Sequence, residues 1–150
     1  MRTSLAALLA AFSVLPAAVR GAEAANALQQ VVSGVEVYLG VVPAEIVAGH
    51  PATHPERQMH GGATGGYHVM VALFDHASGQ RITDAQVSAR LGPPSQPGPE
   101  TRLEPMTIAG APSYGNFLDM TRGGSYRIDF QIRRPGRPEA IPAVFQWTAR

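Results

Sequence analysis

The chain of 150 residues contains no cysteine. This absence excludes a disulfide framework, a thiol nucleophile and a thiolate metal site. Lysine is absent as well, so every basic side chain is arginine, and the formal net charge is only +1. No basic run stands out beyond Arg133-Arg134, which argues against nucleic acid as a partner. Any bound metal must therefore use histidine, methionine, carboxylate or backbone ligands.

The sequence also lacks the common catalytic motifs. It has no G-x-S-x-G nucleophile pattern and no His-Glu-x-x-His pair, and its carboxylates are spread singly along the chain. The glycine-rich run Gly61–Gly66 lacks the Lys-Ser/Thr ending of a phosphate loop and precedes an apolar, strand-like run. We therefore expect neither an enzyme nor a nucleotide site.

Long hydrophobic runs are missing except at the N-terminus. After Arg2, the segment Leu5–Ala18 is almost wholly apolar and carries Pro16 near its end. It is short for a membrane span, which needs about 20 residues, and Ala22-Glu23-Ala24 fits an A-x-A cleavage site. The pattern predicts a signal peptide over residues 1–24, with cleavage after Gly21 as the competing choice. An uncleaved anchor or a buried N-terminal helix is the alternative, and the expected location of the mature protein is the periplasm.

The remainder, residues 25–150, reads as one domain of about seven short strands. Period-two alternation of apolar residues is clearest where Tyr126, Ile128, Phe130 and Ile132 alternate with polar residues. Tyr67–Asp75 is apolar on both faces and is expected to be central. No long helical period occurs, so the pattern predicts an all-β, immunoglobulin-like β-sandwich. The expected strands are Val35–Val47, Tyr67–Asp75, Ile82–Leu91, Leu103–Ile108, Asn116–Met120, Tyr126–Arg133 and Ile141–Thr148, with a helical turn possible over Ala25–Gln30.

One stretch resembles a known group of exported domains. Leu73–Val87, LFDHASGQRITDAQV, has a hydrophobic-Asp strand end, a turn with Ser-Gly, and then Ala-x-Val. It is similar to periplasmic immunoglobulin-like domains of the FixH/YtkA kind and to the small copper-resistance sandwich proteins. The resemblance implies the sandwich fold and, for the copper proteins, binding through His and Met. Their Met-rich runs and N-terminal histidine are missing here, so no ligand residue is carried over.

Histidine and methionine gather around one segment of the chain. All five histidines lie between positions 50 and 76, and Met59-His60 sits in a glycine-rich stretch before the strand that carries His68. His68 and Met70 share a strand face, although Met70 reads as a core residue. Imidazole with thioether suits copper, above all Cu(I). The candidate metal ligands are Met59, His60, His68, Met106 and, in reserve, Met120.

Two functions follow from these patterns. The first is an exported metal-binding protein that binds or delivers copper, with a periplasmic or membrane protein as a candidate partner. The second is a non-catalytic binding or assembly module without metal, which would use the long segment Gly49–Gly66 and the two-faced strand to hold a protein.

Overall fold

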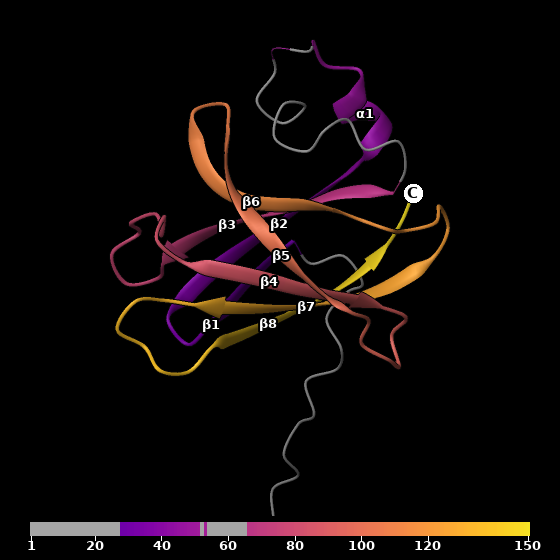
Figure 1. Ribbon diagram of the computed structural model, residues 1–150. Coiled ribbons are helices and arrows are strands. Elements are labelled where there is room, and N and C mark those ends of the chain that lie inside the picture. Colours follow the sequence, from indigo (N-terminus) through magenta and orange to yellow (C-terminus); the bar gives the residue numbers. More distant parts are fainter. Residues whose placement is uncertain (1–27, 52, 54–65) are drawn as a thin grey trace, which may run out of the picture.

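The computed structural model describes residues 28–51, 53 and 66–150, and these form an all-β sandwich (Figure 1). The signal peptide expected over residues 1–24 lies outside this range. One short helix, α1 (Ala44–Ala48), is present in the described part of the chain. The strands are β1 (Gln29–Val32), β2 (Val35–Pro43), β3 (Tyr67–Asp75), β4 (Gln86–Gly92), β5 (Glu100–Ile108), β6 (Ala111–Leu118), β7 (Ser125–Arg133) and β8 (Ile141–Thr148).

All strand pairs are antiparallel, in the order β1-β2-β3-β6-β5-β4-β7-β8. One layer consists of β1, β2, β3, β6 and the second half of β5, and the other of β4, β7, β8 and the first half of β5. The Val144 amide donates to Oε1 of Gln30 at 3.0 Å, which joins β8 to β1. The predicted all-β sandwich is confirmed, as a nearly closed sandwich with eight strands rather than about seven.

The core lies between the layers and is built by alternation. On β7, Ile128, Phe130 and Ile132 are fully buried, and Tyr126 packs against them while half-buried. This is the face that the sequence predicted. The facing layer contributes the odd-numbered residues of β3, since Val69, Val71 and Leu73 are also buried. β3 pairs with β2 on one side and β6 on the other, so its predicted central position is confirmed.

β5 passes from one layer to the other in the middle of its length. Its first half pairs with β4 up to Leu103, and from Glu104 it pairs with β6. Pro105 lies just after this change, where β5 has a partner on one side only. A proline has no N–H for a sheet ladder, so it is tolerated at such a half-edge.

Several boundaries expected from the sequence were wrong. β4 starts at Gln86 instead of Ile82, and β5 starts at Glu100 instead of Leu103. Ile46 and Val47 lie in α1 instead of extending the preceding strand; α1 starts directly after Pro43, whose fixed φ suits the entry to a helix. Gln29 and Gln30 belong to β1, a strand that was not among the seven expected. The sequence analysis had placed these two residues in a helical turn. Ser33 and Gly34, both at positive φ, join β1 to β2 in a tight hairpin.

The fifth expected strand begins earlier in the chain than the sequence indicated. β6 spans Ala111–Leu118, whereas the prediction was Asn116–Met120. Ala109 and Gly110, both at positive φ, form the tight connection between β5 and β6. In the residues that the structure describes, no helix is long and apolar enough to cross a lipid bilayer.

Candidate metal centre

His68 and Met70 lie on the outer face of β3. Their neighbours Val69 and Val71 point into the core, and alternate side chains of a strand point to opposite faces. His68 is nevertheless fully buried. Its ring lies 4.9 Å from the ring of Phe117, its register partner on β6. The imidazole is therefore held against the outside of the sheet, away from bulk water.

Gly115 provides the space beside this histidine. It lies on β6, between β3 and β5, and pairs with Met70 on one side and Glu104 on the other. A Cβ atom at Gly115 would lie 3.0 Å from Nε2 of His68 and 2.5 Å from Sδ of Met106. Two metal-binding atoms therefore meet at the position that a side chain of residue 115 would occupy.

Met106 reaches this position from β5. It is 5% exposed and pairs with Ser113 of β6. It also lines a hollow of about 320 Å³ that forms beyond the point where β5 leaves β4. The hollow is bordered by Thr83, Pro105, Met106, Thr107, Pro112, Ser113 and Tyr114. Met106 is thus buried and also lines a cavity.

The chemistry of these donors suits a soft metal ion. A neutral imidazole nitrogen and a thioether sulfur favour copper, Cu(I) in particular. Within the described residues, no three His, Asp or Glu side chains come together as a site for a harder metal ion. A metal at Gly115 would therefore be held by His68 and Met106, with further ligands from neighbouring residues.

The other predicted ligands are placed differently. Met59 and His60 lie outside the described residues. Met120 is buried in the hydrophobic core cluster, to which His68 and Met106 do not belong. The structure thus brings together two of the predicted residues, His68 and Met106, and places Met120 among core side chains.

Met70 differs from the sequence expectation. The sequence indicated a core residue, but Met70 is half-buried on the outer face, with its side chain over Gly40 of β2. The sequence did contain a signal that Met70 lies on the outer face, because Met70 comes two residues after His68 and shares its strand face. That signal was outweighed because β3 is apolar throughout, and apolarity alone does not show which face is inward.

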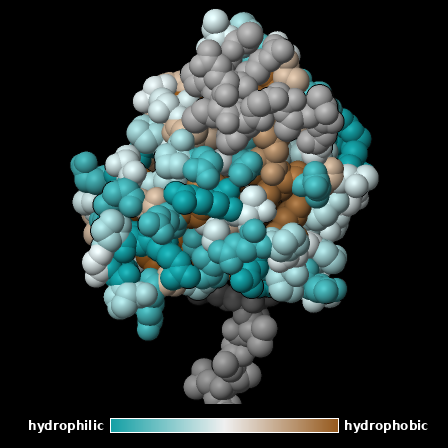
Figure 2. All heavy atoms as spheres, in the orientation of Figure 1, coloured by the Kyte–Doolittle hydropathy of each residue, from teal (hydrophilic) through white to brown (hydrophobic). Residues whose placement is uncertain are grey.

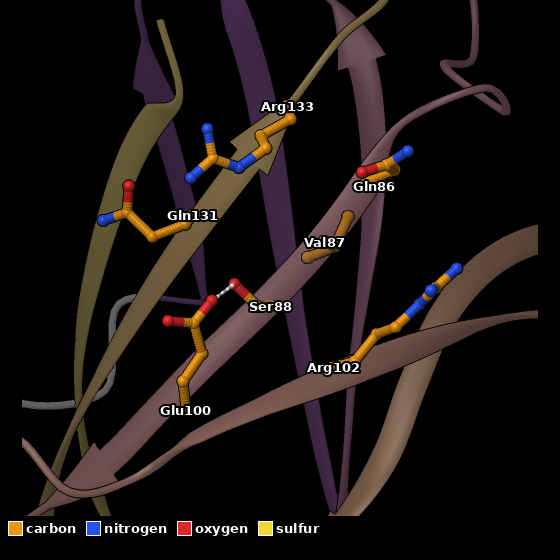
Figure 3. Close-up of a pocket in the computed structure, with 7 residues that line it drawn as sticks. All are labelled: Gln86, Val87, Ser88, Glu100, Arg102, Gln131 and Arg133. Carbon is orange, nitrogen blue, oxygen red and sulfur yellow. Dashed lines mark hydrogen bonds between the residues drawn. The ribbon is translucent and has the colours of Figure 1, made fainter.

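A second hollow lies elsewhere and has a different character. It has a volume of about 170 Å³ and crosses the outer face of β4, β5 and β7 (Figure 3). Ser88 Oγ and Arg90 Nη2 donate to the Glu100 carboxylate at 2.6 Å and 3.0 Å, and the Ser88 bond is the main reason that the pKa of Glu100 is lowered. The surface seen in the orientation of Figure 1 is mainly hydrophilic and has smaller apolar patches (Figure 2). This hollow contains no soft metal ligand.

Comparison with known proteins gives structural neighbours only. No protein-family model and no curated protein matches the chain. A copper-bound variant of FetP from uropathogenic Escherichia coli strain F11 matches with a TM-score of 0.59 at 14% identity, covering 81% of this chain and 93% of that one. A copper-bound variant of P19 from Campylobacter jejuni matches at 0.60 and 14% identity, over 80% and 92%. A DUF4426 family protein from Pseudomonas aeruginosa PAO1 matches at 0.54 and 13%, over 79% and 92%.

At these identities the likeness shows a shared fold. The sandwich is that of FetP, P19 and the DUF4426 protein, in agreement with the resemblance to small copper-related sandwich proteins. These neighbours do not show a likeness to the FixH/YtkA kind. The chain covers nearly the full length of each neighbour.

Proposed function

We propose that this protein is an exported, non-catalytic copper-binding protein that holds copper for storage or delivery. The observation that carries the proposal is the meeting of His68 Nε2 and Met106 Sδ beside Gly115. Copper is the metal whose ligand preferences fit an imidazole and a thioether in a site without thiolates. The copper-bound forms of the structural neighbours FetP and P19 support the same choice.

Met59 and His60 complete the proposed ligand set. They precede β3 in a stretch rich in glycine, which allows the chain to fold back at little steric cost. His68 is fixed by the sheet, so only the preceding segment has to adapt. Together with His68 and Met106, these two residues would give copper four soft donors.

The proposed location is the periplasm, after removal of residues 1–24. The basis is the Arg2, apolar and Ala-x-Ala pattern of the N-terminus. A periplasmic or membrane protein would be the partner that gives or receives copper. The intact mass of the exported protein tests this directly, because cleavage predicts a mature N-terminus at Ala25 or Ala22.

The experiment that tests the function is a competition titration with a chromophoric Cu(I) chelator on the mature protein without a metal-binding tag. His68→Gln and Met106→Leu should each weaken copper binding strongly. Met120→Leu is the matched control, since it makes the same methionine substitution inside the core cluster. Equal affinities in all four proteins, with folding confirmed by thermal unfolding, would contradict the proposal.

One observation favours the second candidate, a protein-binding module without metal. Tyr38 and Phe74 form an edge-on aromatic pair with ring centroids 5.6 Å apart, and the Arg81 guanidinium lies 4.4 Å from the centre of the Phe74 ring. Tyr38 is 39% exposed, and this group lines an open hollow of about 370 Å³. Aromatic and arginine side chains are enriched at protein interfaces. Absence of copper binding in the titration would make this module the better account.

A further inference from the structure

A row of four residues crosses the outer face of the sheet at the level of the metal centre. Gly40 of β2 pairs with Met70 of β3, Met70 pairs with Gly115 of β6, and Gly115 pairs with Glu104 of β5. Residues directly opposite each other in antiparallel strands project to the same face. Met70 therefore lies between two glycines, neither of which has a side chain to separate it from the groups beyond.

The Met70 side chain occupies one of these two positions. A Cβ atom at Gly40 would lie 2.7 Å from Cγ of Met70 and 3.2 Å from its Sδ atom. The thioether therefore lies over Gly40, on the side of Met70 away from Gly115. His68 Nε2 and Met106 Sδ border the other glycine.

Each of the two glycines lies one strand away from Met70, within reach of a methionine side chain. Directly paired Cα atoms of antiparallel strands are about 4.5–5.5 Å apart. Methionine has three rotatable bonds and a polarisable sulfur, and in strands both common χ1 rotamers are accessible. A change of rotamer is therefore the movement that would bring the Met70 sulfur from the Gly40 side toward Gly115, where Met106 Sδ and His68 Nε2 already lie.

We propose that Met70 is a further ligand of the metal centre, and that its thioether moves from Gly40 to Gly115 when the metal binds. The inference rests on the proposed copper function and makes it more specific. With Met70, the described donors are one imidazole and two thioethers. Such a set selects soft monovalent ions, Cu(I) and its analogue Ag(I), over Zn²⁺ and Cu(II).

The first test follows the methionine methyl groups directly. The mature protein, labelled with ¹³C at the methionine methyl groups, is titrated with Ag(I), which is stable in air and has no unpaired electron. Resonances are assigned from Met→Leu variants. The Met70 and Met106 signals should both shift and reach saturation together, and the core Met120 signal should not move. A Met70 signal that stays unchanged while Met106 saturates would overturn the inference.

Affinities give the second test, with a matched pair of substitutions. Met70→Leu removes the sulfur and keeps the volume, and should weaken Cu(I) binding by roughly tenfold or more, equivalent to about 1.4 kcal/mol. Gly40→Ala fills the position that Met70 occupies, so it should displace the thioether toward Gly115 and tighten Cu(I) binding. Cu(I) affinity equal to wild type in Met70→Leu would contradict the role of Met70.

The two proposals fail in distinguishable ways. If Met106→Leu weakens Cu(I) binding and Met70→Leu does not, the copper function stands and the Met70 ligand is rejected. If the wild-type protein binds neither Cu(I) nor Ag(I), the copper function is rejected and the Met70 ligand with it. If Met70→Leu weakens Cu(I) binding but Gly40→Ala does too, the movement from Gly40 is rejected while the ligand role is retained.

Discussion

His68 of β3 and Met106 of β5 approach each other over Gly115, which lies on the strand between them. Side chains from two strands that flank a third are ordinarily separated by the side chain of the middle strand. Here the middle position is glycine, so Nε2 of His68 and Sδ of Met106 border one volume. The candidate metal centre is thus a property of strand order and register, and no single segment of the chain contains it.

Gly115→Ala should abolish or greatly weaken copper binding. The new Cβ would lie 2.5 Å from Met106 Sδ and 3.0 Å from His68 Nε2, which is the volume that the metal needs. The fold should survive, because the closer contact is with the flexible end of a methionine, which can move. Chelator competition and thermal unfolding measure the two effects separately. Copper affinity equal to wild type would show that the metal, if bound, lies elsewhere.

Copper affinity should fall as the pH is lowered. An imidazole binds a metal ion only after losing its proton, so protons compete with copper for the histidine ligands. Thioethers do not titrate, so the imidazole ligands alone determine the slope. The measurement is a chelator competition series from pH 8 to pH 5. An affinity independent of pH over this range would rule out histidine as a ligand.

Ile128→Ala should destabilise the protein by about 2–5 kcal/mol. Ile128 is fully buried on β7, and its removal leaves a cavity between the layers. Gln146→Ala on the neighbouring strand β8 is exposed and serves as the control, with an expected effect within about 0.5 kcal/mol. Urea denaturation followed by circular dichroism measures both. A loss near zero for Ile128→Ala would mean that the core has been assigned to the wrong face.

Tyr114→Phe should cost about 1–3 kcal/mol. The Tyr114 ring is buried in the core, and its hydroxyl accepts a hydrogen bond from the Ala85 amide at 3.0 Å. Phenylalanine keeps the packing but leaves that buried amide without its partner. Phe145→Leu, also in the core, tests packing without any hydrogen bond. Unchanged unfolding free energy in Tyr114→Phe would show that the amide finds another acceptor.

The sequence was sufficient for the sandwich but not for the arrangement of the site. Period-two alternation places Ile128, Phe130 and Ile132 inward, because one face of β7 is polar. The same reasoning fails for β3, where both faces are apolar, and so Met70 was assigned to the core. Alternation also contains no information on which strands are neighbours. The pairing of Gly115 with Met70, which brings His68 and Met106 together, depends on contacts distant in sequence.

The short elements were the least predictable. β1 has only four residues, and its glutamines have low strand propensity. Its position is determined by pairing with β2 and by the bond from Val144 to Gln30. α1 has five residues, too few for a periodic signal. Both depend on tertiary contacts, which a local pattern does not contain.

X-ray absorption at the copper edge is the most direct test of the central claim, that copper binds through His68 and Met106. The mature protein is loaded with one equivalent of Cu(I). Its spectrum should show sulfur scattering and also the outer-shell pattern of imidazole. His68→Gln should reduce the imidazole scattering, and Met106→Leu should lose one sulfur, while Met120→Leu should leave the spectrum unchanged. A wild-type spectrum with only oxygen and nitrogen neighbours, unaltered by either substitution, would contradict the account.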